Sequence, residues 1–342
     1  MNGAIASPLA SANPAAAPEA PDAPDAPRDA APPVIALLSS VLDMRYLAPA
    51  FEAACPGTEL RYADALGAPE RIDAAVCWYP PPGLLATLPR LRLVQSLAAG
   101  IDHLPAGEAR RAPLLCRIVD PTMAGGMAAY VAWAVIHRQR AMDAYLASAA
   151  AGRWQEEPIV PPARHRVGIA GLGTLGEACA RALLALGYAV RGWSRTPRPA
   201  APAQVECFHG AAGLDAFLSG CDTLVCLLPL TEQTRGFLGA EVFARLPRGA
   251  HVVNVGRGAH LDEDALLAAL ATGQLGAATL DAFMQEPLPA GHPFWHHPRI
   301  VVTPHVATRT DAAVIARQTL DNLALARRGL RPPAAVDPAQ GY

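Results

Sequence analysis

Several common features are missing from this sequence, and each absence narrows the range of functions. The chain contains no lysine, so arginine supplies all 28 basic residues, which we interpret as codon bias. The formal net charge is only −2 over 342 residues, which gives no electrostatic basis for binding nucleic acid or an anionic membrane. No apolar run is long enough to span a bilayer, so we expect a soluble protein.

Cysteine pairs that bind metals or form redox motifs are also missing. None of the seven cysteines forms a C-x-x-C motif, and their odd number fits reduced thiols in the cytoplasm. Their positions are Cys55, Cys77, Cys116, Cys179, Cys207, Cys221 and Cys226. His296 and His297 are adjacent and precede a proline, with no carboxylate or cysteine at ligand spacing, so we predict no metal site.

Composition divides the chain into a tail and a longer apolar part. Residues 1–32 are almost all Ala, Pro, Asp and Ser, and cannot bury enough apolar area to offset their ordering entropy. We expect this tail to be disordered, and it lacks the basic start and apolar core of a signal peptide. From Val34 onward, short apolar runs at 34–40, 74–79 and 91–97 alternate with helical patterns, which predicts a parallel α/β sheet.

A second alternating series follows a long helical pattern at 127–154. It contains six candidate strands, from HRVGIAG to RIVVTPH, most of them separated by helical segments. A final helix is expected at 310–329. The chain therefore predicts an α/β protein with two doubly wound parallel-sheet domains, Rossmann-like or flavodoxin-like.

A glycine-rich turn opens the second series. GLGTLG fits G-x-G-x-x-G at Gly171, Gly173 and Gly176, after an apolar strand and before an Ala/Leu-rich helix. The first glycine permits the tight turn, the second lets the backbone approach a pyrophosphate, and the third allows close helix–strand packing. The pyrophosphate would lie at the helix start, at Thr174 and Leu175. The alternative is a structural turn that binds nothing.

The end of the next strand, GWSRTPRP, lacks the acidic residue that usually holds an adenosine ribose. Ser194 stands at that position, Thr196 adds a hydroxyl, and Arg195 supplies a planar donor fork suited to phosphate, with help from Arg198. This pattern favours NADP over NAD. The alternative is a solvated loop that happens to be basic.

Three residues with useful chemistry follow later strands. Arg257 lies in a Gly-flanked turn, Glu286 in a loop, and His305 just beyond the last apolar run. Parallel strands deliver such ends to one edge of a sheet. Arg257 can bind a carboxylate through two hydrogen bonds, and His305 can donate a proton to a carbonyl oxygen. Glu286 can orient the imidazole of His305 and stabilise its charged form. Taken singly, Arg257 and Glu286 are also consistent with a surface ion pair, and His305 with a strand-end histidine of no catalytic role.

Residues 34–342 resemble the D-isomer-specific 2-hydroxyacid dehydrogenase family, in particular its glyoxylate/hydroxypyruvate reductase A branch. The motifs that carry the resemblance are GLGTLG, LLPLTEQTRGFL, LPRGAHVVNVGRG, LDAFMQEPLP, HPRIVVTPHVA and the terminal GY. They occur in family order across nearly the whole chain, and as a set they are highly specific.

The resemblance implies a catalytic set of Arg257, Glu286 and His305. It implies that the amides of Ala99 and Gly100, in SLAAGID, hold the substrate carboxylate together with Arg257. Further cofactor-binding positions implied by the family are Leu228, Pro229, Val255 and, near the nicotinamide, Asp281.

The family's split topology is also implied here. The substrate domain would comprise 33–123 and 309–342, and the dinucleotide-binding Rossmann domain would comprise 124–308. The helix near 127–150 resembles the element that forms the family's homodimer. Position alone suggests a pocket wall from residues such as Trp78, Trp295 and Met123.

These observations predict NADPH-dependent reduction of a small 2-keto acid, glyoxylate or hydroxypyruvate, with His305 as general acid/base. Two alternatives remain: an NAD-linked dehydrogenase of another D-2-hydroxy acid, and a nucleotide-sensing regulator without turnover. The complete set of Arg257, Glu286 and His305 argues against the regulator, which has no need of all three.

Overall fold

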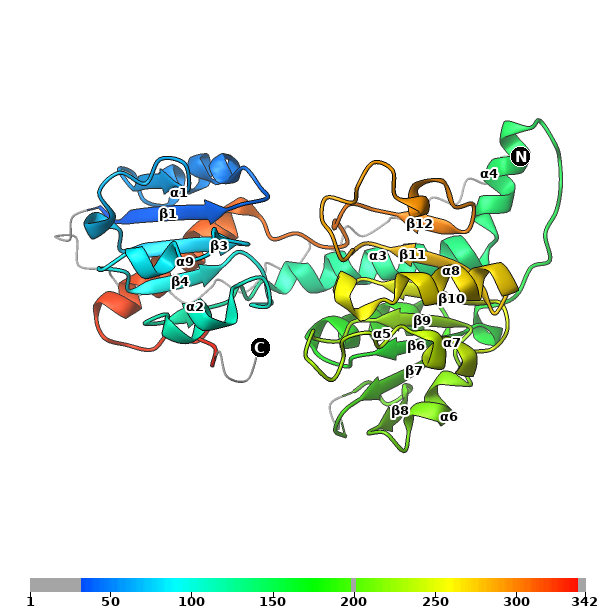
Figure 1. Cartoon of the computed structure of the whole chain (residues 1–342). Helices are drawn as coiled ribbons and strands as arrows, with labels where there is room; N and C mark the ends of the chain where they lie inside the picture. The colour runs from blue at the N-terminus through cyan, green and yellow to red at the C-terminus, as the bar shows by residue number, and fades with distance from the viewer. Residues whose placement is uncertain (1–31, 198–200, 338–342) are drawn as a thin grey trace, which may run out of the picture. The chain divides into compact units, whose positions relative to one another are not determined.

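The computed structural model describes residues 32–197 and 201–337. Within these residues the chain forms two separate parallel β-sheets (Figure 1). The predicted disordered tail, except Pro32, lies outside these residues, as do Arg198 and the terminal Gly-Tyr. All sheet pairings between the named strands are parallel, so the prediction of an α/β protein with two parallel sheets is confirmed.

The first sheet has five strands in the order β2-β1-β3-β4-β5. Their bounds are β1 Val34–Ser39, β2 Glu59–Tyr62, β3 Ala74–Trp78, β4 Leu93–Ser96 and β5 Leu115–Cys116. The sequence did not predict β2 or β5. β2 is half-buried along its length and β5 has only two residues, so neither carries a sustained apolar run.

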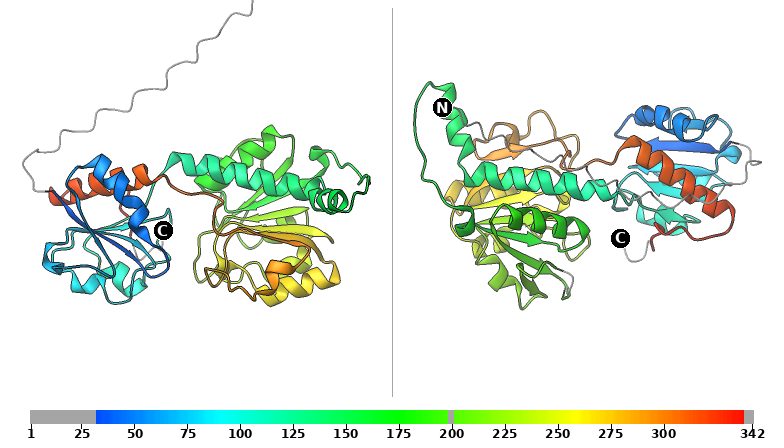
Figure 2. Two further views of the ribbon diagram at one scale, coloured as in Figure 1. Left: turned by 90° about the horizontal axis from the view of Figure 1, so that it is seen from above. Right: turned by 180° about the vertical axis from the view of Figure 1, so that it is seen from behind.

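Helices cover both faces of the first sheet. On one face, α1 (Ala48–Ala54) and α9 (Ala312–Arg327) lie side by side, as the two views in Figure 2 show. The other face is covered by α2 (Ala106–Arg111) and a short helical turn at Leu85–Thr87. Because α9 follows the last strand of the second sheet but packs on the first, the second α/β unit is inserted into the first.

The second sheet has seven strands in the order β12-β11-β10-β9-β6-β7-β8, the doubly wound order with one added edge strand. Their bounds are β6 Arg166–Ala170, β7 Ala189–Ser194, β8 Glu206–His209, β9 Thr223–Cys226, β10 Ala250–Asn254, β11 Leu275–Leu280 and β12 Ile300–Val302. Only β8 was not predicted, because this edge strand is mostly exposed and lacks an apolar run. The chain reverses its winding between β6 and β9, where such folds bind nucleotides.

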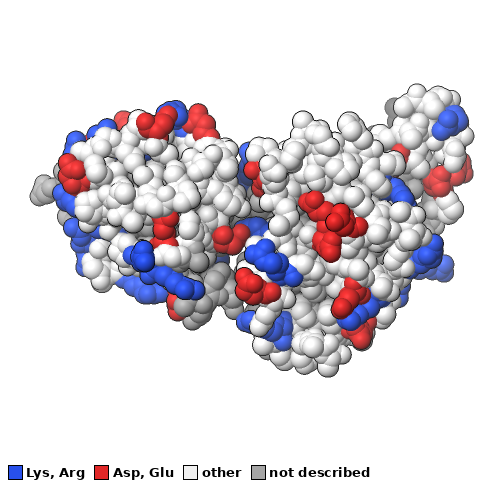
Figure 3. Space-filling model, viewed as in Figure 1, with Lys and Arg blue, Asp and Glu red and all other residues white. Residues whose placement is uncertain are grey.

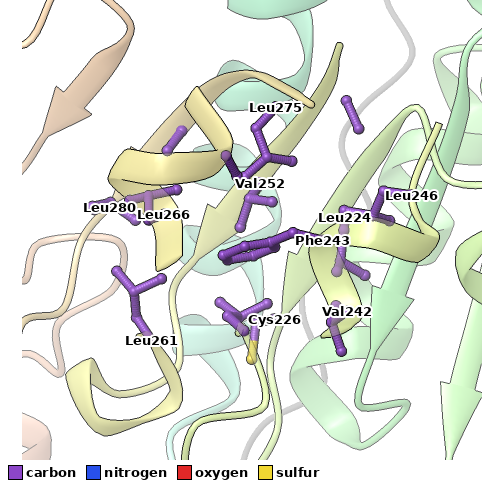
Figure 4. Packing of buried hydrophobic residues seen from close by; sticks show 14 of the residues in the cluster. Leu224, Cys226, Val242, Phe243, Leu246, Val252, Leu261, Leu266, Leu275 and Leu280 are labelled. Atoms are coloured by element: carbon purple, nitrogen blue, oxygen red, sulfur yellow. The ribbon is translucent and has the colours of Figure 1, made fainter. Parts of the chain in front are cut away.

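Apolar side chains from both faces of the second sheet form its core. The helices are α5 Thr174–Ala185, α6 Leu214–Leu218, α7 Ala240–Arg245 and α8 Glu263–Thr272. Phe243 of α7 lies among Leu224, Cys226 and Val252 of the sheet (Figure 4). Burying an aromatic ring of this size stabilises the fold by roughly 2–3 kcal/mol.

The single long helix predicted at 127–154 is wrong. The structure has α3 at Pro121–Gln139 and α4 at Met142–Ala150. The helix starts earlier because the Asp120 carboxylate accepts the Thr122 amide at 2.8 Å, which caps its first turn. The two helices separate at Ala141, whose φ of 53° cannot continue a right-handed helix.

Short helical turns complete the described chain. They span Met44–Leu47, Pro69–Arg71, Leu85–Thr87, Pro162–Arg164, Gly258–His260 and Pro293–His296. Among the described residues, no helix combines the length and the apolar character needed to cross a membrane. On the face seen in Figure 3, arginines and acidic residues are interspersed, which agrees with the small net charge.

Candidate active site

Adjacent strands of the second sheet present the three predicted catalytic residues. Arg257 follows β10, Glu286 follows β11 and His305 follows β12, and these strands are neighbours in the sheet. Their carboxyl ends therefore deliver the three side chains to one edge, as expected for a doubly wound sheet.

His305 and Glu286 form a direct pair. Nδ1 of His305 lies 2.8 Å from Glu286 Oε2, and the other carboxylate oxygen accepts the Phe283 amide at 2.9 Å. Burial opposes ionisation of Glu286, but the hydrogen bond and charge of His305, the Phe283 amide and the charge of Arg257 together lower its pKa. A carboxylate acceptor at Nδ1 places the proton there and leaves Nε2 of His305 for a substrate.

The backbone at His305 is unusual. Its φ is 54°, in the left-handed region that non-glycine residues rarely adopt. Holding a residue there costs on the order of 1–2 kcal/mol, so the surrounding contacts must stabilise it. The conformation turns the chain sharply at the strand end and presents the imidazole at the edge of the sheet.

Arg257 is held by Asp102, a residue that the sequence did not single out. Its Nε donates to Asp102 Oδ2 at 2.8 Å, and its Nη1 donates to the Gly256 carbonyl at 3.0 Å. Burial opposes both charges, but their mutual attraction and hydrogen bond raise the pKa of Arg257 and lower that of Asp102. The only sequence signal for Asp102 was its place two residues after Gly100 in SLAAGID.

The turn that carries Arg257 is fixed by two side chains. The side-chain Nδ2 of Asn254 donates to the Arg257 carbonyl at 3.0 Å, and its Oδ1 accepts a hydrogen bond from the Gly256 backbone amide at 3.2 Å. The Arg257 amide in turn donates to Nδ1 of His260 at 3.0 Å. These bonds fix the backbone around Arg257, whose guanidinium is held separately by Asp102 and the Gly256 carbonyl.

The predicted carboxylate-binding loop follows β4. The buried Ser96 hydroxyl accepts the Ala98 amide at 3.0 Å and lies 2.7 Å from the Gly100 carbonyl, which pins the loop. The structure gives the Ala99 and Gly100 amides no backbone or side-chain acceptor within the described chain. A Cβ at Gly100 would lie 2.7 Å from Arg257 Nη2, so this loop and Arg257 meet closely.

Two aromatic residues at the end of β3 lie beside the predicted catalytic residues. The ring of Trp78 is 6.0 Å from that of His305, edge to face, which supports its position as a pocket wall. Tyr79 has a φ of 47° and was missed by the sequence. Burial, followed by the charges of Asp102 and Glu286, raises the pKa of Tyr79, so its phenol lies near both carboxylates.

The other two suggested wall residues differ in burial. Trp295 is 43% exposed and donates its indole N–H to the Pro289 carbonyl, and Met123 is buried in the core of the first sheet. His103, which the sequence also did not single out, contacts the Trp78 ring, and burial lowers its pKa to about 4.

The glycine turn has the shape required for a dinucleotide. Gly171 has a φ of 109°, and a Cβ there would lie 2.6 Å from the Leu227 carbonyl oxygen. A Cβ on Gly176 would lie 1.9 Å from the Gly171 carbonyl oxygen, whereas one on Gly173 would meet nothing within 4 Å. The open space at Gly173 and the start of the twelve-residue α5 at Thr174 fit a pyrophosphate.

The strand-end residues at β7 occupy the expected position. Ser194 is its last residue and is buried, and its hydroxyl donates to the Thr196 carbonyl at 2.7 Å. Arg195 and Thr196 are exposed. None of the residues 194–196 is acidic, so these positions provide no carboxylate that would repel a 2′-phosphate.

The remaining predicted cofactor positions lie beyond three strand ends. Leu228 and Pro229 follow β9, and Val255 follows β10; Leu228 and Val255 are buried, whereas Pro229 is exposed. Asp281 follows β11 and is 2% exposed. Its carboxylate is occupied by hydrogen bonds from the segment that carries His305, a role that the sequence did not reveal.

The chain is similar to known proteins over most of its length. The family model described as "D-isomer specific 2-hydroxyacid dehydrogenase, NAD binding domain" matches residues 132–307. A glyoxylate/hydroxypyruvate reductase A from Serratia proteamaculans is 41% identical over 283 residues, which cover 79% of this chain and 88% of that protein.

Two crystal structures are similar to almost the whole chain. A D-isomer specific 2-hydroxyacid dehydrogenase from Xanthobacter autotrophicus, in complex with NADPH and MES, has a TM-score of 0.81 at 39% identity and covers 91% of this chain and 100% of its own. An NADPH-dependent glyoxylate/hydroxypyruvate reductase from Sinorhizobium meliloti, in complex with NADP and sulfate, has a TM-score of 0.80 at 36% identity, with the same coverage.

Proposed function

Because the chain belongs to the D-isomer specific 2-hydroxyacid dehydrogenase family, we propose that it reduces a small 2-keto acid, glyoxylate or hydroxypyruvate, with NADPH. Membership makes it an NAD(P)-dependent oxidoreductase. The observation that carries the proposal is the His305–Glu286 pair, 2.8 Å apart, at the same sheet edge as Arg257. The relatives named as glyoxylate/hydroxypyruvate reductases support the choice of substrate class.

Each site residue has a proposed role. The guanidinium of Arg257 and the amides of Ala99 and Gly100 bind the substrate carboxylate. Nε2 of His305 donates a proton to the carbonyl oxygen, and Glu286 keeps the imidazole oriented. NADPH, when bound at the glycine turn, supplies the hydride that reduces the keto carbon.

The cofactor lies, in this proposal, along the carboxyl edge of the second sheet. Gly171, Gly173 and Gly176, with Thr174 and Leu175, hold the pyrophosphate at the start of α5. Ser194, Arg195 and Thr196 face the adenosine 2′-phosphate, and Leu228, Pro229, Val255 and Asp281 lie towards the nicotinamide. The NADPH and NADP complexes of the two similar structures support NADP(H), with NAD(H) as the second candidate.

The domain boundaries follow the same division. Residues 33–123 and 309–342 form the substrate domain, and 124–308 form the dinucleotide-binding domain. The packing of α9 on the first sheet supports this split, and the family match over residues 132–307 lies within the second part.

We also propose that the chain forms a homodimer, as its resemblance to the family implies. Large apolar side chains of α3, α4 and the following loop are exposed, and burying them against a second copy would remove this apolar surface from water. They are Trp133, Leu146, Trp154, Ile159 and Val160, of which Trp154 is 95% exposed. The cytoplasmic location stays a prediction from the cysteine usage.

Initial rates of NADPH and NADH oxidation with glyoxylate and with hydroxypyruvate test the function. We expect turnover of at least one acid with a clear preference for NADPH. A preference for NADH would reject the role of Arg195 and favour the NAD-linked dehydrogenase of another hydroxy acid. Nucleotide binding without turnover of any 2-keto acid would favour the regulator.

The His305→Ala variant tests the catalytic assignment. We expect kcat to fall by at least about a hundredfold, the range for losing a general acid, while the Kd for NADPH is unchanged. Turnover equal to that of the wild type would reject His305 as the proton donor.

A further inference from the structure

Three side chains connect α3 to the segment that carries His305. The Tyr130 hydroxyl lies 2.5 Å from the Thr303 hydroxyl, which donates to Asp281 Oδ1 at 2.6 Å. Because the single proton of Thr303 goes to the carboxylate, Tyr130 is the donor in the first contact. Both hydroxyls therefore donate in the same direction, towards Asp281.

The Asp281 carboxylate holds both sides of His305. On one side it accepts the Thr303 hydroxyl, and on the other it accepts the amides of Val306 at 2.8 Å and Ala307 at 2.9 Å. The carboxylate is buried, so these bonds do not compete with bulk water. Asp281 thus ties together the residues two before and two after His305.

The segment needs such support because of its backbone. His305 is held at a φ of 54°, and its amide donates to the Thr303 carbonyl at 3.0 Å, which closes a tight turn. A non-glycine residue keeps this conformation only where its surroundings fix it. Loss of a bond at Thr303 would allow the turn to relax, and the imidazole would move away from its place beside Glu286.

Helix α3 also contacts the same segment one turn earlier. The Thr308 hydroxyl donates to the Met123 carbonyl at 3.0 Å, and a Cβ on Gly126 would lie 3.0 Å from Thr308 Oγ1. Tyr130 stands four residues after Gly126, on the same side of the helix. The helix therefore supports the His305 segment at Thr303 and at Thr308.

We propose that Tyr130 is a positioning residue for His305, acting through Thr303 and Asp281. The proposal rests on the proposed function for the role of His305 in turnover, whereas the contacts belong to the fold. Tyr130 itself contacts the Thr303 hydroxyl rather than the catalytic pair. Burial raises the pKa of Tyr130, so its phenol remains a neutral donor.

The Tyr130→Phe variant removes only the hydroxyl and is the first test. We expect kcat with the keto acid to fall about tenfold, because small displacements of a catalytic group are costly, while the Kd for NADPH is unchanged. Thr303→Val should lower kcat similarly, and Thr303→Ser, which keeps the hydroxyl, should restore most of it.

Tyr188→Phe is the matched control. The Tyr188 hydroxyl donates to Gln139, also on α3, at 3.2 Å, so this variant removes a comparable bond far from His305 in the fold. We expect its melting temperature to fall as in Tyr130→Phe, with kcat unchanged. Wild-type kcat in Tyr130→Phe, or equal losses in Thr303→Ser and Thr303→Val, would overturn the proposal.

NMR of isotope-labelled histidines in the cofactor-free protein separates this proposal from the proposed function. The His305 signals, assigned with His305→Gln, should shift or broaden in Tyr130→Phe but not in Tyr188→Phe. A moved signal in a protein that reduces no 2-keto acid would reject the function and retain the positioning. Unmoved signals together with normal turnover in Tyr130→Phe would reject the positioning alone.

Discussion

The glycine turn allows stability and cofactor binding to be separated with two alanine variants. In Gly176→Ala, the new methyl carbon would lie 1.9 Å from the Gly171 carbonyl oxygen, whereas carbon and oxygen in contact stay about 3.3 Å apart. The start of α5 or the Gly171 carbonyl must therefore move by about 1.4 Å, the difference between these distances. Overpacking of this kind costs typically 1–3 kcal/mol.

Gly173→Ala meets no such obstacle. A Cβ there would contact nothing within 4 Å, and the backbone, at φ −84° and ψ −168°, is accessible to alanine. We expect its unfolding free energy to stay within about 0.5 kcal/mol of the wild type. The same methyl would occupy the space of the pyrophosphate, so the Kd for NADPH should rise at least about tenfold, equivalent to 1.4 kcal/mol.

Thermal melting and fluorescence titration with NADPH measure the two effects. For Gly176→Ala we expect a melting temperature lower by roughly 4 °C, from about 2 kcal/mol, together with weak NADPH binding. For Gly173→Ala we expect weak binding alone. If Gly173→Ala bound NADPH as tightly as the wild type, the pyrophosphate would not lie at this turn and the reasoning would be refuted.

Three further predictions concern assembly, substrate binding and acid stability. Leu146→Asp combined with Trp154→Asp should reduce the mass in light scattering from two chains to one, and an unchanged mass would contradict the proposed interface. Asp102→Asn should raise KM for the keto acid roughly tenfold, since Arg257 loses its charged acceptor, with the Kd for NADPH as the control. Because burial lowers the pKa of His103 to about 4 from 6.5, the unfolded state binds more protons between these values. The contribution of His103 to the unfolding free energy should therefore fall by about 2 kcal/mol from pH 7.5 to 5, and in urea titrations the fall should be smaller by about this amount in His103→Gln.

Local patterns in the sequence were sufficient for the strands and residues that lie in buried parallel strands or directly after them. β6, β9 and β10 are short apolar runs, and Arg257, Glu286 and His305 follow such runs. The parallel order of the strands then dictates that their carboxyl ends share an edge. The edge strands β2 and β8 escaped prediction because their residues are half-buried or exposed and need not be apolar, and β5 escaped because it has only two residues.

The break between α3 and α4 could not be read from the sequence for a different reason. The stretch around Ala141 is rich in good helix formers, so its intrinsic propensity favours a continuous helix. The left-handed φ of 53° at Ala141 contradicts that local preference. Tertiary contacts decide such conformations because they outweigh the few tenths of a kcal/mol by which propensities differ.

The sequence by itself determined the α/β class, the glycine turn, the strand-end Ser194 and the three candidate catalytic residues, because each depends on neighbours within a few residues. Only the tertiary structure decided which side chains support them. Asp102 and Arg257 are 155 positions apart and Tyr130 and Thr303 are 173 apart, yet both pairs are in hydrogen-bond contact. Periodicity and spacing carry no information on such pairs, since it is the packing of the sheets and α3 that brings them together.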